Sequence, residues 1–168
     1  MDSGTGQRPE VRVAARLLLV DAAQRLLLFH GFDPHRPEET FWFTAGGGVE
    51  PGEELLAAAV RELHEETGVH VAPDEMLGPV WLRRIRFSFE GVEYDSDEWF
   101  FLASLPDSDG TVDTAGFTDL EHRSVLGHRW WSADDLRSAP ETIYPLQLAE
   151  LLPGLLADGW DGRLRVID

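Results

Sequence analysis

The chain has 168 residues, 43% of them hydrophobic, and a formal net charge of −17. This length predicts one domain with a real core, and the acidic balance argues against binding a nucleic-acid backbone, which needs basic patches. The sequence contains no cysteine and no lysine, which excludes disulfides, thiol catalysis, a cysteine-bound zinc site, a P-loop lysine and Schiff-base chemistry.

The N-terminal part predicts a β-hairpin, a loop and a short strand. Residues 11–20 and 25–30 are mostly apolar and predict two β-strands, and the four residues between them suit a turn. Residues 31–40, GFDPHRPEET, contain two prolines and predict a polar loop. Residues 41–44 predict a short strand that leads into a glycine-rich segment.

A helix is predicted over residues 53–67. Pro51 and Gly52 precede it as a turn signal, and Gly68 follows it where a left-handed C-cap belongs. The expected buried stripe of this helix consists of Leu56, Ala59, Val60 and Leu63.

The predicted helix also carries an acidic face. Glu62, Glu65 and Glu66 stand at i, i+3 and i+4, so their carboxylates share one face within a single turn. Glu62 and Glu66 repel each other by about 0.2–0.5 kcal/mol, and Arg61 can neutralise only one charge. A hard divalent cation is the expected counter-charge, because carboxylate oxygens suit Mg²⁺ and Mn²⁺. His64 faces away from this cluster and is expected on the helix surface.

The C-terminal half begins with a second predicted hairpin. Residues 79–89 and 92–104 flank the turn residues Glu90 and Gly91. Residues 105–127 are polar and contain glycine, and a connection of this length predicts a functional lid or a mobile segment.

Three short elements complete the prediction. Residues 128–131 form a last strand, residues 134–137 form a short helix, and residues 142–152 form a helix with Pro145 in its first turn. Pro153 and the glycine after it are expected to end that helix. The resulting fold class is α+β, an α/β/α sandwich with a mixed β-sheet.

The whole chain, 1–168, is expected to be one domain, with residues 1–9 flexible and residues 159–168 as a C-terminal tail. No apolar run is long enough for a membrane span, and the N-terminus lacks the apolar segment of a signal peptide. A cytoplasmic protein is therefore expected. Self-association as a homodimer is left open.

Residues 47–69 resemble the Nudix box, the signature of the Nudix hydrolase superfamily. An isolated E-x-x-E-E is usually a solvated helix face, but nine specified positions agree over these 23 residues, which favours function. The resemblance implies a Nudix-like fold and hydrolysis of a nucleoside diphosphate linked to another moiety. It further implies water attack on phosphorus with Mg²⁺ or Mn²⁺ at the box. Thr44 and Ala45 stand where many members have Leu-Pro, which affects the stiffness of the loop rather than a ligand.

The resemblance also implies roles for single residues. The implied metal ligands are the carbonyl of Gly46 and the carboxylates of Glu62, Glu65 and Glu66. In some members the residue at Glu62 also assists the attacking water. Glu53 and Arg61 match a supporting pair that orients the helix.

The general base is open among three residues. In some members of the family a glutamate on the loop before the last strand assists the water, but Arg129 stands immediately ahead of Trp130 here. Glu121 on the same loop is the nearest substitute, and Glu98 on the preceding strand is another. Glu62 could also do the job itself.

Residues outside the box are candidate substrate contacts. Arg84 and Arg86 share one face of a strand and could clamp a phosphate or, equally, form an exposed strand face. Arg16 interrupts an apolar strand and must find a partner, either the substrate or, preferably, an internal carboxylate. Trp42 could stack on a base, although aromatic residues more often belong to the core. Arg129 is a weaker candidate in a predicted core strand.

The expected function is metal-dependent hydrolysis of a small nucleotide substrate, of the nucleoside triphosphate or NDP-sugar type. The sequence does not identify the base or the second moiety. An alternative is a Nudix-like module that senses nucleotide or ADP-ribose without cleaving it, but a complete set of carboxylates argues against it. A third reading, an isoprenoid diphosphate isomerase-like enzyme, resembles a site with a catalytic cysteine, which this chain lacks. No nucleic-acid or membrane partner is expected.

Overall fold

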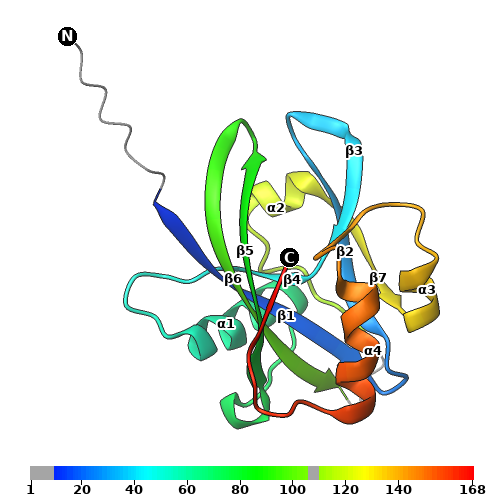
Figure 1. Cartoon of the computed structure of the whole chain (residues 1–168). Helices are drawn as coiled ribbons and strands as arrows, with labels where there is room; N and C mark the ends of the chain where they lie inside the picture. The colour runs from blue at the N-terminus through cyan, green and yellow to red at the C-terminus, as the bar shows by residue number, and fades with distance from the viewer. Residues whose placement is uncertain (1–9, 106–109) are drawn as a thin grey trace.

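The computed structural model describes residues 10–105 and 110–168 (Figure 1). These residues form a mixed sheet of nine strands in the order β8-β3-β2-β1-β6-β5-β9, with β4 paired to β1 and β7 paired to β2. The strands are β1 (Val11–Asp21), β2 (Leu26–Asp33), β3 (Arg36–Phe43), β4 (Ala45–Gly48), β5 (Leu77–Phe89), β6 (Val92–Leu105), β7 (Val125–Trp131), β8 (Ile143–Tyr144) and β9 (Arg165–Ile167). The helices are α1 (Leu55–Thr67), the 3₁₀ turn η1 (Pro73–Glu75), α2 (Asp119–Ser124), α3 (Ala133–Arg137) and α4 (Leu148–Asp158).

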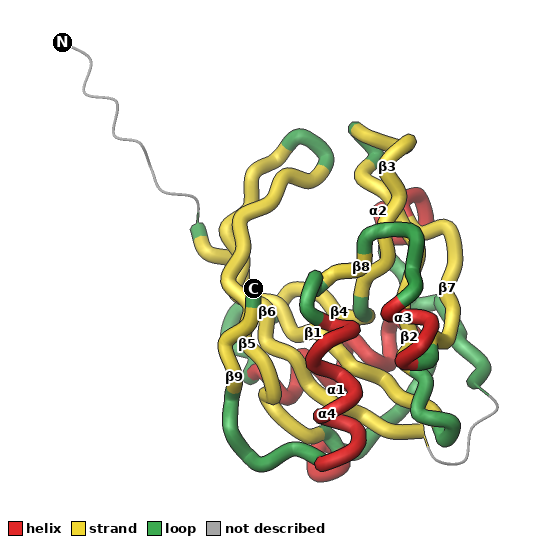
Figure 2. The backbone as a smooth tube through the Cα atoms, turned by 45° about the vertical axis from the view of Figure 1, so that its right-hand side comes forward, coloured by secondary structure: helices red, strands yellow, loops and turns green. Residues whose placement is uncertain are grey.

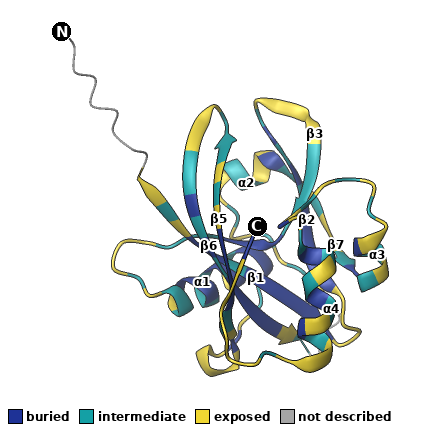
Figure 3. Ribbon diagram, viewed as in Figure 1, coloured by how far each residue is buried: buried dark blue, intermediate teal, exposed yellow. Residues whose placement is uncertain are grey.

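Strand β1 lies in the middle of the sheet and is buried on both faces. Leu18 and Val20 pack in the apolar layer that contains the leucines of α3 and α4. Leu17 and Leu19 pack in the opposite layer, with the apolar residues of α1. This alternation is what a strand covered on both sides requires. Helices therefore cover both faces of the sheet (Figure 3), and the expected α+β sandwich with a mixed sheet is confirmed.

Helix α1 confirms the predicted helix, with a start two residues later. It begins at Leu55 after the N-cap Glu54, and Gly68 adopts a φ of 76° as the left-handed C-cap. The apolar residues that it buries fully are Ala58, Ala59 and Leu63. Leu56 and Val60, expected in the same stripe, are half-buried at its border.

Two long hairpins project from the core in the same direction, one formed by β2 and β3 and the other by β5 and β6 (Figure 2). The second hairpin confirms the prediction for residues 79–89 and 92–104. The tips of the two hairpins touch, because the Asp33 carboxylate accepts a hydrogen bond of 2.9 Å from the backbone N–H of Glu90. The hairpins are therefore joined at their tips as well as through the sheet.

The prediction of a polar loop over residues 31–40 was wrong. Strand β2 continues to Asp33 and β3 begins at Arg36, so the turn between them is only two residues long. Pro34 falls in that turn. Pro37 lies in the part of β3 whose outer edge has no strand partner among the described residues, where a missing N–H costs no ladder hydrogen bond.

The helix predicted over residues 142–152 exists, but both of its bounds were wrong. Residues 143–144 form β8, which pairs in parallel with β3, and α4 starts later and contains Pro153. A proline inside a helix costs about 3 kcal/mol. The leucines that α4 buries, at i, i+4 and i+7, are Leu148, Leu152 and Leu155. Each such burial contributes roughly 1.5–3 kcal/mol, so packing against the sheet offsets the cost of the proline.

The remaining segments agree with the predictions only in part. The short helix over 134–137 is confirmed as α3, and the strand predicted over 128–131 begins earlier, at Val125. Residues 159–168 are not simply a tail, because β9 pairs with β5 and buries Ile167. The described part of the predicted long loop contains α2.

Residues 1–9, expected to be flexible, lie outside the described residues. No helix in the described parts of the chain combines the length and the apolar character needed to cross a membrane.

Candidate active site

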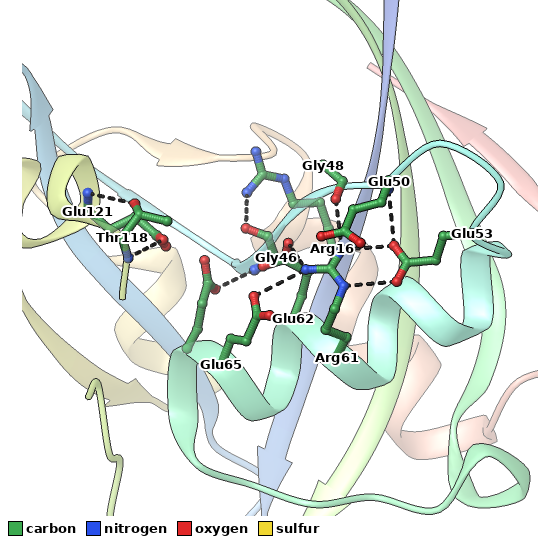
Figure 4. Close-up of polar contacts among 11 residues, drawn as sticks. Arg16, Gly46, Gly48, Glu50, Glu53, Arg61, Glu62, Glu65, Thr118 and Glu121 are labelled. Atoms are coloured by element: carbon green, nitrogen blue, oxygen red, sulfur yellow. Dashed lines mark hydrogen bonds and ion pairs between the residues drawn. The ribbon is translucent and has the colours of Figure 1, made fainter. Parts of the chain in front are cut away.

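The glycine-rich strand β4 pairs with β1 and packs against α1. A Cβ atom on Gly46, whose φ is +132°, would lie 2.2 Å from the carbonyl oxygen of Ala15. A Cβ atom on Gly47 would lie 2.7 Å from a carboxylate oxygen of Glu62. Only glycine permits these approaches. The bare backbone of β4 therefore forms one wall of the acidic site (Figure 4).

Arg61 ties three carboxylates to the β4 backbone (Figure 4). Its Nε and Nη2 donate to the two oxygens of Glu53 at 2.9 and 2.8 Å, and Nη2 also donates to the Gly48 carbonyl at 3.0 Å. Its Nη1 donates to Glu62 at 2.9 Å and to Glu65 at 3.1 Å. The hydrogen bonds from Arg61 lower the pKa of Glu53 to about 2. Glu53 and Arg61 thus form a bidentate pair that can hold α1 against β4.

Two of the box carboxylates are buried. Glu66 accepts a hydrogen bond of 2.6 Å from the backbone N–H of Gly46 and is only 5% exposed. Burial, followed by the neighbouring carboxyl group of Glu121, raises the pKa of Glu66. Burial also raises the pKa of Glu62, against the opposing effect of Arg61. Among the described residues, Arg61 is the guanidinium that forms ion pairs with these carboxylates, which leaves negative charge to be compensated.

Helix α2 brings Glu121 to this cluster. A capping box starts the helix, in which the Thr118 hydroxyl accepts from the Glu121 N–H and the Glu121 carboxylate accepts from the Thr118 N–H at 3.0 Å. Burial raises the pKa of Glu121, but its hydrogen bonds with Glu66 and Thr118 outweigh burial and hold that pKa below its usual value. The sequence interpretation missed α2, although the T-x-x-E spacing is a capping-box signal that could have revealed it.

Glu98 lies between two arginines. Arg16 donates to one of its oxygens at 3.3 Å and to the carbonyl of Gly46 at 3.2 Å, so Arg16 meets the preferred internal carboxylate. Nε of Arg83 donates to the other oxygen at 3.0 Å, and Nη2 lies 2.9 Å from it. Glu98 is 3% exposed. Because both of its oxygens are held, it is poorly placed to accept a proton from water.

The arginines of β5 point to opposite faces of the sheet. Arg83 shares its face with the buried Trp81, and its role beside Glu98 was missed from the sequence. The two-residue spacing of Arg83 from Trp81 could have revealed it, because residues two apart on a strand lie on the same face. Arg84 and Arg86 point the other way, with side chains 66% and 67% exposed, and pair with aspartates of β6 at 3.6 and 2.7 Å. The structure directs these two away from Glu98, and a role for them in substrate binding stays a prediction.

The remaining candidates lie in packed or exposed positions. The Trp42 indole stacks on the His30 ring, with centroids 4.3 Å apart, and donates to Glu141 at 3.3 Å. Its role as a base platform is not tested by this packing. Arg129 pairs with an aspartate of α3 at 3.2 Å. His64 is exposed and lies on the surface of α1, as expected.

The chemistry of the donor set fits a hard divalent cation. Carboxylate oxygens are offered by Glu62, Glu65 and Glu66, and one backbone carbonyl by Gly46. In the parts of the chain that the structure describes, no three His, Cys, Asp or Glu side chains are arranged so that they could hold a metal ion. The carboxylate oxygens of Glu62 and Glu65 instead accept hydrogen bonds from Arg61, and that of Glu66 accepts from the Gly46 N–H. The Gly46 carbonyl accepts from Arg16. Metal binding at these four residues stays a prediction.

Comparison with known proteins identifies the family to which the chain belongs. The NUDIX domain family matches residues 10–153. The chain belongs to the Nudix family. The resemblance of residues 47–69 to the Nudix box is thereby confirmed.

Several proteins of known name are similar to this Nudix chain. It is 44% identical over 66 residues to the m7GpppN-mRNA hydrolase NUDT17 of Danio rerio, which covers 39% of this chain and 22% of that protein. It is 30% identical over 136 residues to the RNA pyrophosphohydrolase of Halorhodospira halophila, which covers 76% of this chain and 75% of that protein. Among solved structures, a MutT protein from Methanosarcina mazei matches the fold with a TM-score of 0.62, over 91% of this chain and 98% of that one, at 16% identity. The chain thus spans less than a quarter of the Danio rerio protein.

Proposed function

We propose that this Nudix chain is a metal-dependent pyrophosphohydrolase. Its substrate would be a nucleoside diphosphate linked to another moiety, cleaved by water attack on phosphorus. One observation carries the proposal, namely the three carboxylates on one turn of α1 that Arg61 and the bare β4 backbone surround. One relative is named an mRNA hydrolase and another an RNA pyrophosphohydrolase, which supports cleavage of a pyrophosphate bond without identifying the substrate.

Bound at Glu62, Glu65 and Glu66, Mg²⁺ or Mn²⁺ would neutralise phosphate charge and supply an activated water. The chain itself supplies orientation and a base. Arg61 fixes two of these carboxylates relative to β4. Glu121 lies beside Glu66, and its carboxylate is the group that would accept a proton from the attacking water.

Hydrolysis should disappear in excess EDTA and return when Mg²⁺ or Mn²⁺ is added, because the carboxylates otherwise repel an anionic substrate. The measurement is phosphate or pyrophosphate released from a panel of nucleoside triphosphates, NDP-sugars and dinucleoside polyphosphates. RNA 5′ ends belong in the panel because of the relatives' names, although the net charge of −17 disfavours RNA. Full activity in EDTA would contradict the proposal. Binding without turnover of every substrate would instead support a sensing module.

The Glu121→Gln substitution is expected to lower kcat by about 10²-fold, at the lower end of general-base effects. The fold should persist, because the glutamine oxygen can still accept from the Thr118 N–H. Asp119→Asn is the matched control, since Asp119 lies exposed on the same helix and loses the same charge. If Glu121→Gln keeps the native rate at saturating metal, Glu62 becomes the remaining candidate for the base.

A further inference from the structure

A small cavity of about 30 Å³ lies between the two hairpins, on the face of the sheet opposite α1. Arg16, Arg83 and Glu98 line it from β1, β5 and β6, and Tyr144 lines it from β8. This volume holds about one water. Tyr144 is 38% exposed and contacts Arg83, whose guanidinium carbon lies 5.7 Å from the ring centroid. The cavity, which Phe43 and Phe100 also line, is therefore a recess with a charged wall beside Tyr144.

The recess carries an excess of positive charge. Arg16 and Arg83 share a single carboxylate, that of Glu98. A third arginine, Arg12, lies four residues before Arg16 on the same face of β1, outside the lining of the cavity. Burial, followed by the charge of Arg16, lowers its pKa, and the charges of Glu98 and Glu62 oppose this effect. Buried cations that outnumber their carboxylate partners are costly. An anion bound beside them would remove that cost.

An unpaired hydroxyl lies on the same face. Ser96 stands two residues before Glu98 on β6 and opposite Arg12 in the register with β1. Its Oγ is buried and has no hydrogen-bond partner among the described residues. A buried hydroxyl without a partner is uncommon. Ser96 therefore offers a free donor next to the arginines.

Only one residue of backbone separates this recess from the acidic site. The N–H of Gly46 donates to Glu66, whereas its carbonyl accepts from Arg16. Both contacts of Arg16 are long, at 3.2 and 3.3 Å, whereas Arg83 holds Glu98 at 2.9 and 3.0 Å. Arg16 is thus the more weakly held of the two guanidinium groups and the one that can turn toward a ligand at the mouth of the recess.

We propose that Arg16 and Arg83 bind a phosphate group of the substrate, the one next to the phosphorus that water attacks. The planar guanidinium group matches the spacing of phosphate oxygens, and the recess lies on the far side of Gly46 from the acidic cluster. This inference rests on the proposed function. It explains how a chain with a net charge of −17 can bind a second phosphate group of the substrate beside the phosphate at the acidic site.

Binding of inorganic pyrophosphate in EDTA, measured by calorimetry, tests the proposal without turnover. Arg16→Gln and Arg83→Gln should each weaken binding by about 10-fold or more, as expected for a lost charge-assisted hydrogen bond. Arg165→Gln is the matched control, because Arg165 lies on β9 and its exposed side chain pairs with Asp161 at 2.7 Å. Glu98→Gln should tighten binding severalfold, because it removes the carboxylate that competes for both arginines.

The opposite signs separate anion binding from a structural role, since damage to the fold would weaken binding in every variant. Arg83→Lys keeps the positive charge but lacks the planar guanidinium group, which can donate two parallel hydrogen bonds. The affinity of this variant for pyrophosphate should therefore lie between those of the wild type and Arg83→Gln. No pyrophosphate binding by the wild type, weaker binding in Glu98→Gln, or equal losses in Arg83→Gln and Arg165→Gln would each overturn the proposal. A chain that hydrolyses nucleotides with Mg²⁺ but fails these tests loses only the phosphate subsite.

Discussion

The Glu66→Gln substitution is expected to lower kcat by about 10³-fold or more while the chain stays folded. Glu66 is buried beside Gly46 and is one of three carboxylates on the acidic turn of α1. Glutamine keeps an oxygen that can accept from the Gly46 N–H, so the position of β4 should be preserved. It removes the negative charge that a cation needs. The loss should appear equally in kcat and in kcat/KM, because a group that acts on the transition state is removed.

His64→Gln is the matched control for this experiment. His64 lies on the same helix, two residues before Glu66, but its side chain is exposed and stacks on His70 with ring centroids 3.7 Å apart. Its replacement should leave kcat close to the native value. Thermal unfolding of both variants shows whether the fold is intact. A Glu66→Gln protein that is folded and keeps a near-native rate would rule out the role given to this carboxylate.

The Arg61→Gln substitution is expected to lower the free energy of unfolding at neutral pH by about 2–3 kcal/mol. Removing one partner of a fully buried ion pair costs roughly 3–5 kcal/mol, and the Arg61 side chain is 24% exposed, so a smaller loss is expected. Three carboxylates would lose their common donor, and β4 would lose the bond from Arg61 to the Gly48 carbonyl. Denaturant unfolding at pH 7 measures the difference. Arg84→Gln, with an exposed side chain, should cost much less.

The same substitution should have a characteristic pH dependence. Arg61 lowers the pKa of Glu53 from 4.5 to about 2. A carboxyl group with a lowered pKa in the folded state stabilises the fold above its unfolded pKa, and this contribution is lost as the pH falls through the folded pKa. The wild type should therefore lose this stability between about pH 4.5 and pH 2, whereas Arg61→Gln lacks it throughout. The difference between the two unfolding curves should narrow over that range, and a constant difference would contradict the role of Glu53.

The sequence alone determined the core of the candidate site. The positions of Glu62, Glu65 and Glu66 follow from the period of a helix, and Gly68 ends that helix because glycine adopts a left-handed conformation easily. Such features depend on short-range geometry. They can be predicted without knowing what packs against the helix. The pairing of Arg61 with Glu53, which lies just before the helix, was implied by the resemblance to the Nudix box rather than by helix geometry.

The predictions from the sequence were wrong where the local effect of a proline competed with strand pairing or with packing. The prolines of residues 31–40 predicted a loop, but one lies in a tight turn and the other on an open strand edge. Pro153 was expected to end a helix, but buried leucines on both sides of it keep α4 continuous. In both cases the outcome depends on neighbours that are distant in the chain. The capping box of α2 was readable, but it was not recognised inside a long polar segment.

Only the tertiary structure decided which arginines lie near the acidic site. Arg16 and Glu98 are 82 residues apart, and their contact arises because β1 and β6 pair in parallel. A one-residue difference along β5 separates the buried Arg83 from the exposed Arg84, because successive side chains of a strand point to opposite faces. The sequence shows that alternation but not which face is covered. That choice is made by the helices and hairpins that close over the sheet, so the acidic turn was predictable and the basic recess beside it was not.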